Sequence, residues 1–114
     1  MKLIDLFEAT ATGDCYRAAG KYIIENSEYT LVHAEVTGQA HLEGIKYGHA
    51  WVEKGNTVID VSNGRFIKMP KADYYAMGKI STTKGKMFRY TSTEAIRAMV
   101  SSKHWGPWDL KTER

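Results

Sequence analysis

The strongest constraint on the fold is a β-hairpin encoded by two alternating segments, KYGHAWVE and TVIDVS, on either side of a Gly55–Asn56 turn. Glycine at the first position of a two-residue turn favours type II′, whose twist matches that of the flanking strands. With this turn, His49 and Asp60 become diagonal neighbours on one face, about 7 Å apart at Cα. Their side chains can then meet in a hydrogen bond.

The hairpin register also sorts the side chains between two faces. One face carries only apolar residues: Ala50, Val52, Ile59 and Val61. The other carries His49, Trp51, Glu53, Val58, Asp60 and Ser62. Because side chains alternate along a strand, a slip of one residue would place Asp60 beside Ala50 on the apolar face. The pattern therefore favours the chosen register.

The remaining elements are predicted from periodicity and turn signals. Helices are expected at 2–9, 15–26, 71–80 and 91–104, and strands at 29–37, 46–53, 57–62, within 63–70 and at 86–91. Thr12 or Asp14 can cap the second helix, and Thr91 with Glu94 forms a capping box for the last. We expect a single α+β domain spanning 1–114, with a small antiparallel sheet packed against an N-terminal helix that carries the cysteine.

Composition excludes several classes of function. The net charge is only +3, and Lys and Arg are spread along the chain, so we predict no specific nucleic-acid partner. No apolar run approaches the roughly 20 residues of a membrane helix, and the first ten residues include acids, so we predict a cytoplasmic protein without a membrane partner. A single cysteine and four histidines without metal-helix spacing predict neither a metal nor another cofactor.

The only cysteine, Cys15, falls in the first turn of the predicted 15–26 helix. The helix dipole and the free N–H groups at that end favour a thiolate and can stabilise an oxyanion. A carboxylate such as Asp60 fixes the tautomer of a histidine and stabilises its charged form. Together the three residues suggest Cys15 as a nucleophile served by His49. Taken singly, the cysteine reads as a small buried hydrophobe, the histidine as a structural residue and the aspartate as a turn cap.

A cysteine that opens a helix, followed by GHAWVE and then VIDVS, resembles the papain-like and transglutaminase-like thiol enzymes. The resemblance covers roughly Gly13 to Asn63. It implies a papain-like or transglutaminase-like core and a peptide or protein substrate. It also implies that Cys15 is the nucleophile, His49 the general base and acid, and Asp60 the orienting carboxylate.

The chain departs from that family pattern at two positions. Papain-like enzymes usually take an oxyanion donor from a glutamine upstream of the cysteine, whereas the only glutamine here, Gln39, follows it. Gln39 is therefore a candidate substitute donor. Trp51 is a candidate wall of the substrate site, or else an aromatic that packs on the cysteine helix. Val61 stands where the family often has proline.

The whole chain also resembles a group of small uncharacterised bacterial and phage proteins, through GDCYRAAGKYI, LVHAEVTGQ, VIDVSNGR and the terminal GPWDL. That resemblance implies no reaction, and for a phage protein it implies the host cytoplasm.

Three functions therefore remain open. The first is a Cys–His–Asp hydrolase or acyl-transferase acting on an amide, isopeptide or thioester bond. The second is an ADP-ribosyltransferase-like protein in which His33 contacts a nucleotide and DYYAMG stacks a base. The third is a non-catalytic phage-encoded module that blocks a host factor through Trp105, Trp108 and Leu110.

Overall fold

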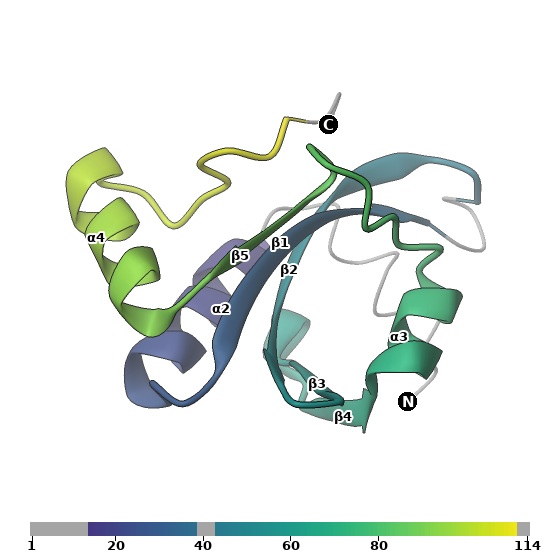
Figure 1. The fold of residues 1–114 in the computed structure, drawn as a ribbon, viewed down its shortest axis with the longest axis horizontal. Coiled ribbons are helices and arrows are strands. Elements are labelled where there is room, and N and C mark those ends of the chain that lie inside the picture. Colours follow the sequence, from purple (N-terminus) through teal and green to yellow (C-terminus); the bar gives the residue numbers. More distant parts are fainter. Residues whose placement is uncertain (1–13, 39–42, 112–114) are drawn as a thin grey trace.

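The computed structural model describes residues 14–38 and 43–111 (Figure 1). The helices are α2 (Asp14–Glu25), α3 (Lys71–Met77) and α4 (Ser92–Ser102), with a short 3₁₀ turn, η3, at Ser62–Gly64. The strands are β1 (Thr30–Thr37), β2 (Lys46–Lys54), β3 (Thr57–Asp60), β4 (Ile67–Pro70) and β5 (Met87–Tyr90). The helix expected at 2–9, the caps expected from Thr12 or the Asp14 side chain, and Gln39 lie outside the described residues.

The five strands form one antiparallel sheet in the order β4-β3-β2-β1-β5. The predicted α+β class, with a small antiparallel sheet and an N-terminal helix, is confirmed. The hairpin register is also confirmed, because Lys54 pairs with Thr57 and Val52 with Ile59. Gly55 has φ +59°, the left-handed value that a type II′ turn requires at its first position.

The helices cover both faces of the twisted sheet, with α2 and α4 on one side and α3 on the other (Figure 1). Alternation along β2 and β3 places Val52 and Ile59 in the core beneath α2. It places Trp51 and Val58 in a second core beneath α3. The face that carries His49, Trp51 and Asp60 is therefore as buried as the apolar one. The reason is topological: α3 lies in the connection from β4 at one edge of the sheet to β5 at the other.

Local sequence signals explain the helix ends. The Thr91 hydroxyl accepts from the Glu94 N–H at 3.1 Å, and the Glu94 carboxylate accepts from the Thr91 N–H at 2.9 Å, which confirms the capping box at α4. Pro70 immediately precedes the first turn of α3. Proline is favoured at a helix start because the N–H groups there have no partner within the helix, and proline has no N–H.

The segment after α4 folds back onto the body of the protein (Figure 1). Leu110 is buried, and Trp105 and Trp108 pack against the core beneath α2. These three side chains therefore close a core, and Trp105 and Trp108 keep part of their surface exposed.

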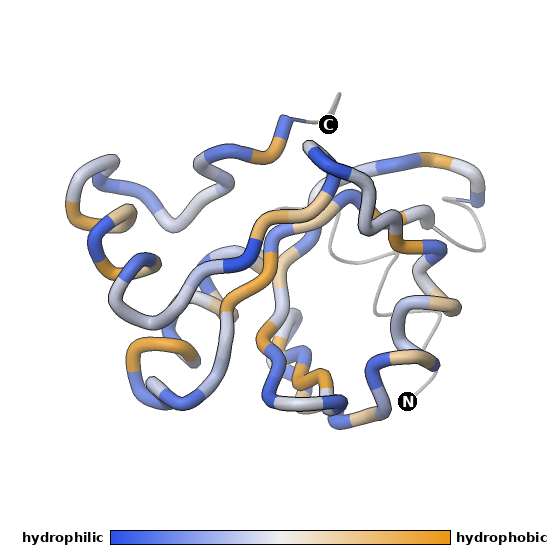
Figure 2. The backbone as a smooth tube through the Cα atoms, in the orientation of Figure 1, coloured by the Kyte–Doolittle hydropathy of each residue, from blue (hydrophilic) through white to orange (hydrophobic). Residues whose placement is uncertain are grey.

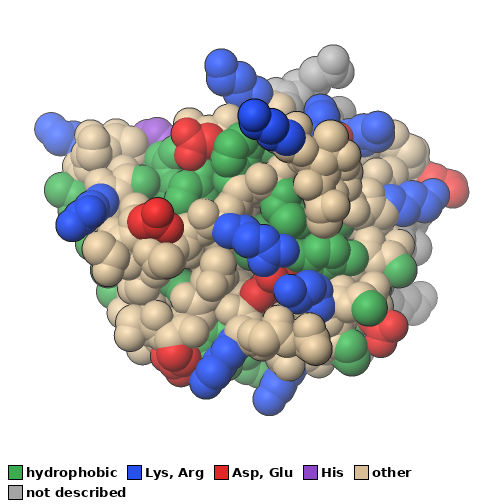
Figure 3. Space-filling model, in the orientation of Figure 1, with side chains coloured by type: hydrophobic (Ala, Val, Ile, Leu, Met, Phe, Trp, Pro, Cys, Tyr) green, Lys and Arg blue, Asp and Glu red, His purple; other side chains and the backbone are tan. Residues whose placement is uncertain are grey.

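The face of the molecule seen in Figure 3 carries side chains of both charges. Figure 3 shows Lys and Arg side chains dispersed over the visible face, and Figure 2 shows hydrophobic and hydrophilic positions interleaved along the strands and α4. Among residues 14–38 and 43–111, no helix combines the length and the apolar character needed to cross a lipid bilayer.

Candidate thiol active site

Three separate elements bring together the sulfur, the imidazole and the carboxylate singled out in the sequence. Cys15 lies in the first turn of α2, His49 in β2, and Asp60 at the end of β3. The ladder between β2 and β3 extends only to the Val52–Ile59 pair, so His49 and Asp60 lie just beyond it, and η3 contacts α2 there. All three side chains are fully buried.

His49 and Asp60 form the hydrogen bond that the hairpin register predicts, with 2.7 Å between Nε2 and Oδ2. Asp60 also accepts from the Tyr74 hydroxyl through Oδ2, and from the Ser62 N–H at 2.9 Å and the Ser62 hydroxyl at 2.7 Å through Oδ1. Burial alone would raise the pKa of Asp60, but the His49 charge and these hydrogen bonds lower it. Asp60 is therefore held as a carboxylate.

Cys15 lies close enough to the His49 ring to act on its charge state. Since Nε2 is bonded to Asp60, Nδ1 is the ring nitrogen through which His49 would exchange a proton with the thiol. Burial would lower the pKa of His49, but the charges of Asp60 and Cys15 and the hydrogen bond to Asp60 raise it to about 10. The arrangement favours an imidazolium placed between two groups that can carry negative charge.

Tyr74 is a part of the site that the sequence did not single out. Burial, followed by the nearby Asp60 charge, raises the pKa of Tyr74 well above its usual value, so the hydroxyl remains a donor at neutral pH. Ser62 had a local signal, since a hydroxyl residue two positions after an aspartate commonly closes such a turn. Tyr74 had none, because only the packing of α3 on the sheet brings it to Asp60.

The structure places Trp51 beside His49 and beneath α3. Its indole is fully buried beneath α3, with ring centroids 5.1 Å from Tyr74 and 5.9 Å from His49, and it belongs to the core cluster opposite the α2 side. The expectation that Trp51 packs on the cysteine helix is therefore wrong, because its side chain points to the face of β2 that α3 covers. Trp51 is as buried as the thiol, so its role as a wall of the substrate site stays a prediction.

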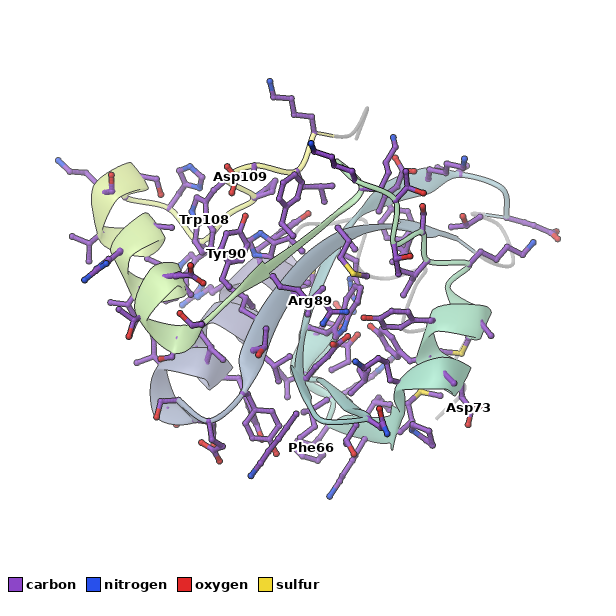
Figure 4. The ribbon with its side chains drawn as sticks, viewed as in Figure 1. Phe66, Asp73, Arg89, Tyr90, Trp108 and Asp109 are labelled. Carbon is purple, nitrogen blue, oxygen red and sulfur yellow. The ribbon has the colours of Figure 1, made fainter. Side chains whose placement is uncertain are left out.

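The indole N–H of Trp51 donates to Glu53 at 2.8 Å. Glu53, itself buried, also accepts from the Tyr75 hydroxyl and from Arg89 at 2.6 Å, and Arg89 lies between β5 and α3 (Figure 4). This network accounts for a buried carboxylate that would otherwise be costly.

His33, the residue that the second interpretation places against a nucleotide, lies in an aromatic cluster. It is fully buried among Tyr16, Tyr90 and Trp108, at centroid distances of 4.9, 5.1 and 4.9 Å. Contact between His33 and a nucleotide, as in the ADP-ribosyltransferase-like interpretation, would therefore need the aromatic packing around the ring to open.

The two neighbouring tyrosines of α3 offer a matched test of the Asp60 network. Tyr74→Phe removes one donor to Asp60, and we expect it to lower the free energy of unfolding by about 1–2 kcal/mol and to weaken the His49–Asp60 pair. Tyr75→Phe removes a donor to Glu53, which retains Trp51 and Arg89. Urea unfolding and alkylation of Cys15 at pH 6 are the measurements. Equal effects of the two variants on alkylation would argue against a role for Tyr74 at the thiol.

Within the described part of the chain, no three His, Cys, Asp or Glu side chains are grouped so that they could hold a metal ion. Comparisons of this chain with protein-family models, with curated proteins and with solved structures found no match.

Proposed function

We propose that this chain is a cysteine hydrolase or acyl-transferase with a papain-like or transglutaminase-like core. It would act on an amide, isopeptide or thioester bond of a peptide or protein through Cys15, His49 and Asp60. The observation that carries the proposal is the buried His49 ring, which bonds to Asp60 at 2.7 Å and whose pKa is also raised by the neighbouring Cys15. This is the order of groups that activates a thiol nucleophile.

In the first half of the reaction the Cys15 thiolate forms a sulfur–carbon bond to the substrate carbonyl, whose π electrons move to oxygen. His49 holds the proton from the thiol. When the tetrahedral intermediate collapses, the bond to the leaving amine or thiol breaks, and His49 donates that proton to it. The product is an acyl-enzyme thioester, with His49 now neutral and hydrogen-bonded to Asp60.

In the second half, water or an amine attacks the thioester and gives its proton to His49. The sulfur–carbon bond breaks and restores the thiolate–imidazolium pair. Asp60, fixed by Ser62 and Tyr74, orients the ring in both halves. Backbone N–H groups in the first turn of α2 are candidate oxyanion donors because they have no partner within the helix. A donor role for Gln39 remains part of the proposal.

The three side chains have no exposed surface, so a substrate must reach them through a local opening of the structure. Opening lowers the rate of any reaction at Cys15 by the fraction of open molecules. Amide hydrogen exchange at pH 6 and pH 8 measures that fraction, and the alkylation rate corrected for it reports on the thiol and its partners.

Alkylation of the intact protein by iodoacetamide tests the proposal directly, because the single cysteine makes the added mass specific to Cys15. An isolated thiol with a pKa of about 8.5 loses roughly 80-fold in rate between pH 8 and pH 6. For a thiolate–imidazolium pair we expect less than about a fivefold loss. Mass spectrometry over time gives both rates.

Two controls make the result interpretable. The urea-unfolded chain supplies the isolated thiol, and Cys15→Ala must show no added mass. Asp60→Asn, which weakens the support of His49, should move the folded protein toward the isolated-thiol profile. If the folded wild type and the unfolded chain lose rate in the same proportion, the proposed pair does not exist.

A further inference from the structure

A second concave site lies between α2 and α4, apart from the buried thiol site. Its apolar wall consists of Ile24, Ile96, Met99, Val100 and Trp105, and its volume is about 490 Å³. Three of these side chains are among the most exposed large hydrophobic residues of the described chain: Ile24 at 46%, Ile96 at 38% and Val100 at 72%. A pocket of this size and character is typical of small-molecule binding sites.

The floor of the pocket depends on close packing at Gly20. A Cβ at that position would lie 2.6 Å from Trp105 Cε3 and 3.1 Å from Met99 Cε. Glycine costs up to about 1 kcal/mol in a helix interior, so its presence in α2 is explained by the approach of the Trp105 ring. The Trp105 ring, which lines the pocket, is therefore held close against α2.

One end of the pocket is polar and cationic. Lys103 and His104 complete the lining, and no acidic residue contributes to it. In the described part of the chain, the Lys103 ammonium has no ion-pair or hydrogen-bond partner. His104 Nδ1 accepts from the Gly106 N–H at 3.1 Å, so in the neutral ring the proton is on Nε2, which can donate to a ligand.

We propose that this pocket binds a free aliphatic carboxylate of medium chain length. The alkyl chain would lie against Ile24, Ile96 and Val100, and the carboxylate would accept from Lys103 and His104. An apolar wall with unpaired donors at one end complements an amphiphilic anion, because each part of the ligand meets a surface of matching chemistry. The negative end of the α4 dipole opposes an anion only weakly, by about 0.3–1 kcal/mol.

Titration with sodium decanoate, below its micelle-forming concentration, tests the proposal on the intact chain. Methyl NMR should show saturable shifts at Ile24, Ile96 and Val100, and none at Val32 and Val58 in the core beneath α3. Acetate has the head without the chain and decyltrimethylammonium has the chain with the opposite charge. Acetate should bind at least about tenfold more weakly because it lacks the buried alkyl chain, at about 0.8 kcal/mol for each CH₂ group. Decyltrimethylammonium should also bind at least about tenfold more weakly, since one charge-assisted hydrogen bond is worth about that factor.

Two variants separate recognition from folding. Lys103→Gln should weaken decanoate binding by about tenfold, and Val100→Glu, at an exposed position, should abolish it by placing a carboxylate in the wall. Both should retain the wild-type melting temperature within a few degrees. If Lys103 only stabilises the end of α4, Lys103→Gln will lower the melting temperature and leave decanoate affinity unchanged.

Two further outcomes would overturn the proposal. Equal affinity for decanoate and decyltrimethylammonium would show non-selective adsorption to an apolar surface. Concentration-dependent shifts of the same methyl groups without ligand, together with a dimer in sedimentation velocity, would show that a second copy of the chain occupies the pocket.

Discussion

Replacing Asp60 with alanine is expected to lower the free energy of unfolding by about 3–5 kcal/mol, the range for removing one partner of a buried ion pair. The carboxylate accepts from four donors, namely His49 Nε2, the Tyr74 hydroxyl, and the N–H and hydroxyl of Ser62. Alanine offers none of them an acceptor. It also leaves the His49 ring, whose pKa is raised mainly by Asp60 against the effect of burial, without its counter-charge.

Asp60→Asn is the sharper variant because it preserves shape. An asparagine has one side-chain oxygen and one NH₂ group, so donors that now meet Oδ1 or Oδ2 would face another donor. We expect a loss of at least about 2 kcal/mol. Asp73→Asn is the matched control, since Asp73 is exposed on the outer side of α3 (Figure 4) and its loss should cost less than about 1 kcal/mol.

The pH dependence of the Asp60→Asn effect has a defined sign. His49 has a folded pKa of about 10, above the ordinary 6.5, so its contribution to stability is complete below pH 6.5 and is lost as the pH rises through 10. Asp60 has a lowered pKa, so its contribution is present above the ordinary aspartate value and is lost as the pH falls. The difference between wild type and Asp60→Asn should be largest near pH 5–6.5 and should shrink toward pH 10.

Urea unfolding of wild type, Asp60→Asn and Asp73→Asn at pH 6 and pH 9.5 provides the measurement. An Asp60→Asn protein as stable as Asp73→Asn at pH 6 would contradict the account of Asp60 as the centre of a charged network. A difference that grows toward pH 9.5 would contradict the assignment of the positive charge to His49.

The hairpin and its His49–Asp60 pair were predictable because they depend on local chemistry. Gly55 supplies the positive φ of the turn, and the alternation of side chains then fixes which residues share a face. The position of Cys15 at a helix start followed from periodicity alone. These signals act over a few residues, so a single sequence contains them.

The environment of the pair was not predictable in the same way. Tyr74 reaches Asp60, and Trp51 packs beneath α3, because α3 crosses the sheet between its two edges. No pattern along the chain encodes that crossing. The expectation that Trp51 contacts α2 failed for this reason. Alternation along a strand predicts which residues share a face of the sheet, but it does not predict which helix covers that face.

His33 provides the second large effect, at acidic pH. Burial lowers the pKa of His33 to about 3, against an opposing influence from the Asp109 carboxylate. In the described part of the chain neither ring nitrogen has a hydrogen-bond partner, so the Asp109 charge compensates a positive charge on the ring only in part. Tyr90, Trp108 and Asp109 lie close together beside α4 (Figure 4), and the Tyr90 hydroxyl donates to Asp109 at 2.6 Å.

The depressed pKa makes His33 a source of instability as the pH falls. Below pH 6.5 the unfolded chain binds a proton that the folded chain does not bind until about pH 3. Between pH 7 and pH 5 the free energy of unfolding should therefore fall by about 2 kcal/mol. Each pH unit below 6.5 contributes about 1.36 kcal/mol, because only the unfolded chain is protonated there. The cost should continue to grow toward pH 3.

His33→Phe removes the titration and retains an aromatic ring among Tyr16, Tyr90 and Trp108. Its stability at pH 7 will fall if the larger ring is crowded, because a Cβ at Gly106 would already lie 2.6 Å from His33 Cε1. The informative quantity is therefore the change in unfolding free energy from pH 7 to pH 5 within each protein, which should be about 2 kcal/mol smaller in His33→Phe than in wild type.

His104→Asn, at an exposed histidine, should keep the wild-type change. If His33→Phe loses stability as steeply as wild type, carboxylates and not His33 govern the acid response, and the ring must have a proton acceptor in solution.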